Sequence, residues 1–361
     1  LFGLESQQPI KNFDFLGITL QYEMCYTNIL QILELSQIPL KACDRTWDDP
    51  IVIGGGPCSY NPEPIAAFFD LFYIGEGETQ YRSLLDLYKK MRSKDCSRES
   101  FLREASKVPG IYVPSLYQVT YHEDGTIASF EPLYDDVPLT VCKEVETNIS
   151  DTFYPVKPVV PFIKATQDRV VLEIQRGCIR GCRFCQAGFC YRPVRPRNAD
   201  TLYRQAVDSL EFSGNHEITL SSLSTSDYKQ LEILANGLLD YCEDKKINLS
   251  LPSLRADNFS QELMLKVQRV RKSGLTFAPE AGTQRLRDAI NKNVTEEEIL
   301  STCATAFSGG WNNVKLYFML GLPTETDEDI IGIADLAAKI VHTWRENATN
   351  KKRGLSINLA T

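Results

Sequence analysis

The stretch VVLEIQRGCIRGCRFCQAG, residues 170–188, decides the fold of this chain. It opens with a short apolar run at 170–174, rich in branched residues, which predicts a buried strand. Three cysteines follow close together, at Cys178, Cys182 and Cys185. Glycines at 177, 181 and 188 permit the tight backbone that a small loop with three thiols requires. The stretch therefore predicts a strand that leads directly into a thiol-rich loop.

Strand and helix patterns alternate from this stretch to the end of the chain. The predicted strands are residues 170–174, 217–220, 247–251, 275–278, 314–319 and 355–359. The predicted helices are residues 199–212, 226–242, 260–271, 284–290, 296–307 and 327–344. This number of strand–helix units is three-quarters of a closed barrel, so we expect a partial (β/α)6 barrel over residues 166–361. Barrel active sites lie at the carboxyl ends of the strands, which is where the cysteine loop falls.

The N-terminal part of the chain indicates a second α/β domain. Strands at 15–20, 51–53 and 71–74 alternate with helices at 26–35, 62–69 and 81–91. This alternation favours a doubly wound, Rossmann-like parallel sheet over residues 1–95. Because the chain begins at Leu1 rather than Met and stops after a strand-like run, we expect a fragment with both ends truncated.

Residues 96–165 differ from both flanking regions. They are rich in proline, and the turn at 122–126 separates two strand-like runs, 117–121 and 127–130. This pattern is typical of a hairpin. We therefore interpret residues 96–165 as a bridging segment that carries a small antiparallel element.

The chain has 11 cysteines and no basic-then-apolar leader. We therefore expect a reducing, cytoplasmic compartment, where a disulfide framework is a poor explanation. Most isolated cysteines are expected to be small buried residues, namely Cys25, Cys43, Cys142, Cys242 and Cys303. Neighbouring thiolates, in contrast, ligate iron–sulfur clusters or zinc.

Three thiolates on a four-iron cluster leave one iron open to a substrate or cofactor. A zinc site would need Cys190 as a fourth ligand, and such sites usually combine two distant pairs of ligands. An iron–sulfur cluster is therefore the favoured prediction, and a zinc site is the alternative.

The motif Cys178-x3-Cys182-x-Phe184-Cys185 resembles the signature of radical S-adenosylmethionine (SAM) enzymes. The segments EIQRGC, YRPVR, LSSLSTSDY and FAPEAGT, which start at residues 173, 191, 220 and 277, are similar to one group within that superfamily, the cobalamin-binding-domain radical SAM proteins. The resemblance implies a [4Fe–4S] cluster held by the three cysteines, with SAM bound at the open iron. Reduction of the cluster would cleave SAM to methionine and a 5′-deoxyadenosyl radical.

The resemblance also implies the residues that contact the cofactor. They are Ser221 and Ser222 at the SAM amino group, Arg255 at its carboxylate, Glu280 and Gln284 at the ribose hydroxyls or the methionine end, Gly321 and Pro323 in the turn beside the adenine, and Phe184 facing the adenine. Each position also has a purely structural interpretation. The serines can cap a strand end, Arg255 can pair with Asp257, Glu280 can be a solvated carboxylate, and Gly321 can belong to an ordinary turn.

In the N-terminal domain, Thr19, Gly54 and Gly55 end two strands in a pattern that resembles the cleft of cobalamin domains. The resemblance implies cobalamin as a possible cofactor of the full-length parent protein. The loop that supplies a lower axial histidine is missing, since none of the three histidines lies in such a context. A plain glycine turn is the alternative for residues 54–56.

Because the net charge is −8, we do not expect strong non-specific binding to nucleic acids. No apolar run reaches the length of a membrane span. Residues 176–197 nevertheless hold six arginines and no acid. They are expected to attract an anion or an acidic electron donor such as flavodoxin or ferredoxin, or else to pair with carboxylates elsewhere.

The sequence therefore predicts a radical SAM enzyme of unknown substrate, with cobalamin-assisted methyl transfer or methylthiolation as candidate reactions. The alternative is a non-catalytic iron–sulfur protein that acts as a regulator or scaffold.

Overall fold

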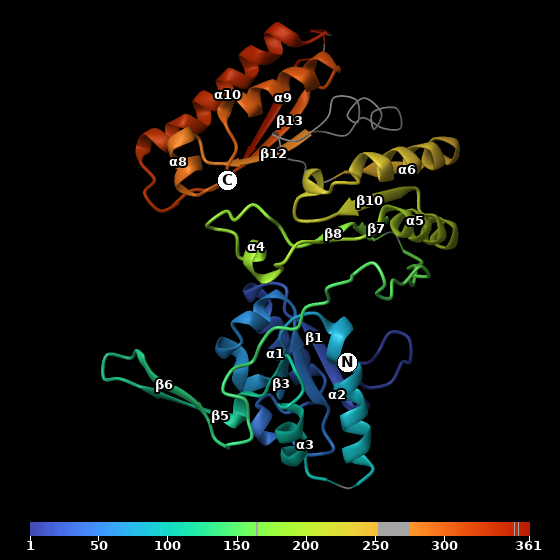
Figure 1. Cartoon of the computed structure of the whole chain (residues 1–361), viewed down its shortest axis with the longest axis vertical. Helices are drawn as coiled ribbons and strands as arrows, with labels where there is room; N and C mark the ends of the chain where they lie inside the picture. The colour runs from blue at the N-terminus through green and yellow to red at the C-terminus, as the bar shows by residue number, and fades with distance from the viewer. Residues whose placement is uncertain (95, 164, 252–274, 350, 353) are drawn as a thin grey trace. The chain divides into compact units, whose positions relative to one another are not determined.

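The computed structural model describes residues 1–94, 96–163, 165–251, 275–349, 351–352 and 354–361 (Figure 1). The chain divides into two compact units, Leu1–Thr147 and Asn148–Thr361, which are called unit 1 and unit 2. The division of the chain at residues 95 and 165 stays a prediction. No helix within the described residues is long and apolar enough to cross a membrane.

Unit 1 is built on a four-stranded sheet in the order β1-β2-β3-β4. Its strands are β1 (Phe15–Thr19), β2 (Ile51–Gly55), β3 (Leu71–Tyr73) and β4 (Ile111–Tyr112). The first three are parallel and confirm the predicted strands, while β4 is antiparallel to β3. The helices are α1 (Tyr26–Leu35), α2 (Gly77–Arg92) and α3 (Arg98–Ala105). The predicted helix at 62–69 is instead a short 3-10 helix, Glu63–Phe68, which contains Pro64, a residue without a backbone N–H to donate.

A buried charge network holds this sheet in place. Asp70 is 2% exposed, and its Oδ2 accepts hydrogen bonds from the Val52 amide at 2.7 Å and from Arg45 Nη1 at 2.9 Å. Arg98 Nη2 lies 2.8 Å from the same oxygen. Asp70 therefore connects β2 to Arg45 in a loop and to Arg98 in α3.

The predicted hairpin is confirmed by β5 (Tyr117–Tyr121) and β6 (Ile127–Pro132), which pair antiparallel and extend away from the sheet of unit 1 (Figure 1). Most residues of the hairpin are exposed, while Tyr117 and Phe130 pack against Tyr112 of β4.

Unit 2 contains two three-stranded parallel sheets. One has the order β11-β10-β7, from β7 (Val170–Glu173), β10 (Glu217–Ser221) and β11 (Asn248–Ser250). The other has the order β12-β13-β14, from β12 (Leu275–Glu280), β13 (Asn313–Phe318) and β14 (Ser356–Ala360). All six predicted strands are confirmed, whereas their closure into one partial barrel stays a prediction. The predicted helix at 260–271 and Arg255 lie outside the described residues.

Helices follow the strands of unit 2 along the chain. They are α4 (Gln186–Cys190), α5 (Ala199–Ser213), α6 (Leu231–Lys245), α8 (Gln284–Ala289), α9 (Glu296–Ser308) and α10 (Asp327–Asn347). Apolar faces of α5 and α6 pack on the first sheet, with Leu202 and Leu238 fully buried against Leu172 and Leu220. A second core packs α9 and α10 on the other sheet. The alternation of strand and helix therefore builds two layered halves, each with its own core.

Two sequence predictions need correction. The helix expected from residue 226 begins only at Leu231, because Thr225–Asp227 form a 3-10 turn. The carboxylate of Asp227 is held there by tertiary contacts, which override the local helical pattern. Cys242 and Cys303 are buried as expected, but Cys25, Cys43 and Cys142 are exposed. Cys25 and Cys43 lie in short 3-10 turns at the surface, where no core forms around them.

Candidate functional site

The cysteine loop is closed at its base by a short ladder. Strand β8 (Gln175–Arg176) pairs antiparallel with β9 (Arg195–Pro196), so the loop at 177–194 leaves and returns at the same point. Gly177 has a φ of 87°, and a Cβ there would lie 2.6 Å from the carbonyl oxygen of Tyr191 and 2.7 Å from that of Pro193. The path of the loop therefore requires glycine at this position.

The three predicted ligands, Cys178, Cys182 and Cys185, have half-buried side chains. The Sγ of Cys185 caps α4 and accepts a hydrogen bond from the Gly188 amide at 3.4 Å. The Sγ of Cys178 accepts one from the Arg180 amide at 3.5 Å. These two contacts hold the sulfur atoms of Cys178 and Cys185 in place on the loop.

Within the described ranges, no group of three or more His, Cys, Asp or Glu side chains is arranged to hold a single metal ion. A four-iron cluster places each thiolate on a different iron, so its ligands do not converge on one ion. The chemistry of the donor set, with three thiols on one loop and amide donors beside them, fits such a cluster. The ligand roles of the three cysteines stay predictions.

On one side, the cysteine loop is tied to the segment after β10. The guanidinium of Arg180 contacts both carboxylate oxygens of Asp227, with Nε 2.9 Å from Oδ2. Ser224 Oγ donates to the same Oδ2 at 2.7 Å, and the Asp227 side chain is only 8% exposed. A well-formed, bidentate pair of this kind restricts the loop.

On the other side, the loop is tied to the end of α8. The Arg183 amide donates to the Ile290 carbonyl at 3.0 Å, and its guanidinium donates to the Ala289 carbonyl at 2.5 Å. Asn291 Nδ2 donates to the Gly181 carbonyl at 2.9 Å. The thiols therefore lie on a loop that is pinned from two sides.

Phe184 contributes an apolar anchor to the second side. Its half-buried ring packs against a small cluster of Ala281, Leu286, Ile290 and Leu322, which comes from α8 and from the turns after β12 and β13. The predicted contact of Phe184 with adenine stays a prediction, and the cluster shows what holds the ring in place.

The base of the loop uses its arginines for pairing. Arg176 binds Glu173 through two hydrogen bonds, at 3.0 and 2.9 Å, and Arg197 Nη2 lies 3.2 Å from Glu173 Oε2. Burial alone would raise the pKa of Glu173, but the hydrogen bonds and charges of the two arginines outweigh burial and hold this pKa below its usual value. Arg195 is 5% exposed and donates to the carbonyls of Pro193 and Tyr191. Internal pairing thus occupies much of the basic cluster.

The predicted contacts to SAM lie at strand ends, as expected. Ser221 ends β10 opposite Glu173, and Ser222 Oγ lies 3.1 Å from Thr225 Oγ1. Glu280 ends β12 with a φ of 66°, and its Oε1 lies 3.0 Å from Lys292 Nζ. The strained backbone and the ion pair hold this carboxylate in one place.

Gln284 and Gly321, two of the remaining predicted positions, form hydrogen bonds with other residues of the chain. Gln284 begins α8, and its amide binds Asp288 at 2.8 Å and Arg287 at 3.1 Å. Gly321 has a φ of 79°, and its amide donates to Glu325 Oε2 at 2.7 Å, while Pro323 is exposed in the same turn. The cofactor roles of these residues stay predictions.

In unit 1, Thr19 and Gly55 end two paired strands, and Thr19 is exposed. Gly54 has another role, because a Cβ there would lie 2.7 Å from the ring of Phe72. The aromatic core therefore fills the space that a cofactor cradle would leave open. These three residues offer one hydroxyl and one uncrowded glycine, and they do not form a complete cobalamin receptor within the described part of unit 1.

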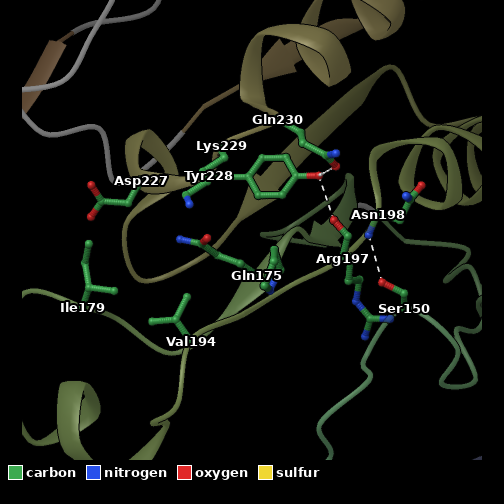
Figure 2. Close-up of a pocket in the computed structure, with 11 residues that line it drawn as sticks. Ser150, Gln175, Ile179, Val194, Arg197, Asn198, Asp227, Tyr228, Lys229 and Gln230 are labelled. Carbon is green, nitrogen blue, oxygen red and sulfur yellow. Dashed lines mark hydrogen bonds between the residues drawn. The ribbon is translucent and has the colours of Figure 1, made fainter.

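A pocket of about 600 Å3 lies beside the cysteine loop (Figure 2). It is lined by Ser150, Gln175, Ile179, Val194, Pro196, Arg197, Asn198, Asp227, Tyr228, Lys229 and Gln230. None of these residues is among the predicted cofactor contacts. They come from four separate segments, so no local motif in the sequence indicates the pocket.

Two family models match the chain. Residues 1–114 match the model described as "Radical SAM proteins, N-terminal", and residues 172–337 match "Radical SAM superfamily". An uncharacterized protein of Methanocaldococcus jannaschii is 35% identical over 94% of this chain and 66% of its own length. A second protein of that organism, provisionally named a methylthiotransferase, is 25% identical over 45% of this chain and 37% of its own length. The chain spans less than two thirds of either relative.

Solved structures share the fold at low identity. TsrM from Kitasatospora setae, a radical SAM methyltransferase with cobalamin and a [4Fe–4S] cluster bound, is 13% identical with a TM-score of 0.59, over 97% of this chain and 64% of that chain. OxsB, a cobalamin-dependent radical enzyme with aqua-cobalamin and SAM bound, is 17% identical with a TM-score of 0.53, over 90% and 43%. The likeness shows a shared mixed α/β fold.

The second family model covers the whole cysteine loop, including the three cysteines of the signature. Superfamily membership implies a [4Fe–4S] cluster and SAM as cofactors. The chain belongs to the radical SAM superfamily.

Proposed function

We propose that this chain is a radical SAM enzyme in which Cys178, Cys182 and Cys185 hold a [4Fe–4S] cluster. The observation that carries the proposal is the double anchoring of the cysteine loop, by Arg180 and Asp227 on one side and by contacts to α8 on the other. A loop held in this way presents its thiols in a defined arrangement, which a ligand site requires.

When bound, such a cluster supplies an open iron for SAM and the electron that cleaves SAM to methionine and a 5′-deoxyadenosyl radical. The residues of the chain then have positioning tasks. The amides of Arg180 and Gly188 hold the sulfur atoms of Cys178 and Cys185 in place, and Glu173 keeps Arg176 and Arg197 at the base of the loop. The strand-end residues Ser221 and Glu280 are proposed to bind SAM.

We expect the electron to come from an acidic protein such as flavodoxin or ferredoxin, because residues 176–197 carry six arginines and no acid. For the full-length protein, cobalamin-assisted methyl transfer or methylthiolation is the proposed downstream reaction class, suggested by the names of TsrM and the second M. jannaschii relative. Because the ring of Phe72 occupies the space beside Gly54, no cobalamin-dependent step is proposed for this chain.

The test is anaerobic reconstitution with iron and sulfide, followed by dithionite and SAM. We expect about four irons and four sulfides per chain, and formation of 5′-deoxyadenosine detected by mass spectrometry. Cys182→Ala is expected to lose both, whereas the matched control Cys190→Ala keeps both.

Three outcomes would contradict the proposal. A loaded cluster without 5′-deoxyadenosine would indicate the non-catalytic iron–sulfur protein instead. One zinc per chain and no iron–sulfur absorption would indicate a structural zinc site. Loss of the cluster in Cys190→Ala would show that the assignment of the three cluster ligands is wrong.

A further inference from the structure

We propose that the pocket beside the cysteine loop binds a small organic anion with an apolar body and one acidic oxygen group. Its volume of about 600 Å3 lies within the range of small-molecule sites. Its apolar lining comes from Ile179, Val194, Pro196 and the ring of Tyr228, and Figure 2 shows Ile179 and Val194 on the side away from Ser150 and Asn198. No predicted SAM contact lines it, so the site goes beyond the proposed function and is independent of it.

The opposite part of the pocket presents donors, because the acceptor atoms there are already used. Ser150 Oγ accepts the Asn198 amide at 2.9 Å, and Asn198 Oδ1 accepts the Asp200 amide at 2.9 Å. Gln230 Oε1 accepts the Ala199 amide at 3.0 Å, and the Tyr228 hydroxyl donates to the Arg197 carbonyl at 2.8 Å. The Ser150 hydroxyl proton, Asn198 Nδ2 and Gln230 Nε2 have no partner among the described residues. These groups match the oxygens of an anion.

The charged groups at the pocket also favour an anion. Lys229 is exposed at the pocket and makes no hydrogen bond or ion pair with a described residue. Arg197 is 4% exposed and is paired with Glu173, while its Nε is buried without a partner in the described structure. The one carboxylate in the lining, Asp227, is neutralised by Arg180. A ligand with an acidic group would therefore meet the positive charge of Lys229.

Two helix ends add to this field. Asn198 is the N-cap of α5 and Gln230 is the N-cap of α6, each helix has 15 residues, and both caps line the pocket. The positive ends of two helix dipoles thus lie at one pocket. Neither Asp200 nor Glu232, the acids in the first turns, lines it. A cationic or neutral head group would gain nothing from this arrangement.

Three probes with the same body test the charge preference: 4-phenylbutyrate, 4-phenylbutanol and 4-phenylbutylammonium, titrated calorimetrically into the whole chain. We expect the carboxylate to bind about tenfold more tightly than the alcohol, since a charge-assisted contact contributes roughly 1.4 kcal/mol more. The ammonium is expected to bind most weakly. Acetate and inorganic phosphate, which lack the body, are expected to bind too weakly to saturate by about 10 mM.

Variants locate the binding. Lys229→Ala is expected to reduce carboxylate affinity about fivefold and to leave the alcohol unchanged, and Lys229→Arg to restore the preference. The matched control is Lys351→Ala, an exposed lysine of the same unit outside the pocket. Val194→Trp fills the apolar wall and is expected to abolish binding of all three probes, with thermal unfolding as a check of its fold. Equal affinity for the three head groups, no saturation by the carboxylate, or unchanged binding in both Lys229→Ala and Val194→Trp would overturn the proposal.

Discussion

The cysteine loop of unit 2 and the glycine run at the end of β2 in unit 1 both place glycine at the end of a strand, but the structure uses these glycines differently. At Gly177, a positive φ and two neighbouring carbonyl oxygens require glycine for the path of the loop itself. At Gly54, the ring of Phe72 occupies the space of the missing side chain, so the hydrophobic core requires glycine. A glycine at a strand end therefore indicates a ligand cradle only where no group of the chain fills the space beside it.

The largest effect is expected for Gly177→Ala. The new Cβ would lie 2.6 Å from the Tyr191 carbonyl oxygen in a backbone conformation that L-residues avoid. The loop should then hold its thiols out of place, and iron affinity should fall about 10–100-fold, as for lost supporting contacts at metal sites. The measurement is bound iron per chain during titration with limiting iron and sulfide.

Gly214→Ala is the matched control, because Gly214 has a φ of 69° and an added Cβ there would meet nothing within 4 Å. It reproduces the backbone strain without the crowding, so its iron affinity should stay unchanged. An equal loss in both variants would show that Gly177 is not special to the loop.

The second effect concerns the clamp between the cysteine loop and the segment after β10. Asp227→Asn removes the carboxylate charge that the Arg180 guanidinium contacts, in a site where Asp227 is 8% exposed. We expect a loss of about 2–3 kcal/mol in the free energy of unfolding, below the cost at fully buried pairs because Arg180 is 22% exposed. Denaturant titration measures it, with the exposed Asp208→Asn as control. A change of less than about 0.5 kcal/mol would show that the clamp is an ordinary surface pair.

The limits of sequence reasoning follow from the same contacts. The strands of unit 2 could be predicted because short apolar runs between helical patterns record burial locally. The partner of Arg180 could not, because Asp227 lies 47 residues away in the chain. The predicted start of α6 is too early for the same reason, since a tertiary contact holds Asp227 in a turn. The pocket has no local signature, because it is assembled from distant segments.

Gly54→Ala tests the other side of the comparison and should act on unit 1 alone. Its Cβ would lie 2.7 Å from the Phe72 ring, and overpacking of this kind costs about 1–2 kcal/mol of unfolding free energy. Gly55→Ala is the control, since its Cβ would meet only the Tyr73 carbonyl oxygen at 3.9 Å. Urea titration compares the variants, and iron binding should be unchanged in both. If Gly54→Ala is neutral, the space beside Gly54 is open, and a ligand cradle becomes the better interpretation.

The smallest effect is a pH dependence at the base of the cysteine loop. Burial opposes the charge of Glu173, but Arg176 and Arg197 outweigh burial, so the pKa is lower in the folded than in the unfolded chain. Such a carboxylate stabilises the folded chain when the pH is above the pKa of the group in the unfolded chain, about 4.3. This stabilisation is lost as the pH falls through the pKa of the group in the folded chain. The difference in unfolding free energy between wild type and Glu173→Gln should therefore be constant from pH 7 to pH 5 and shrink below about pH 4. A difference that grows on acidification would mean that Glu173 is held protonated rather than paired with the two arginines.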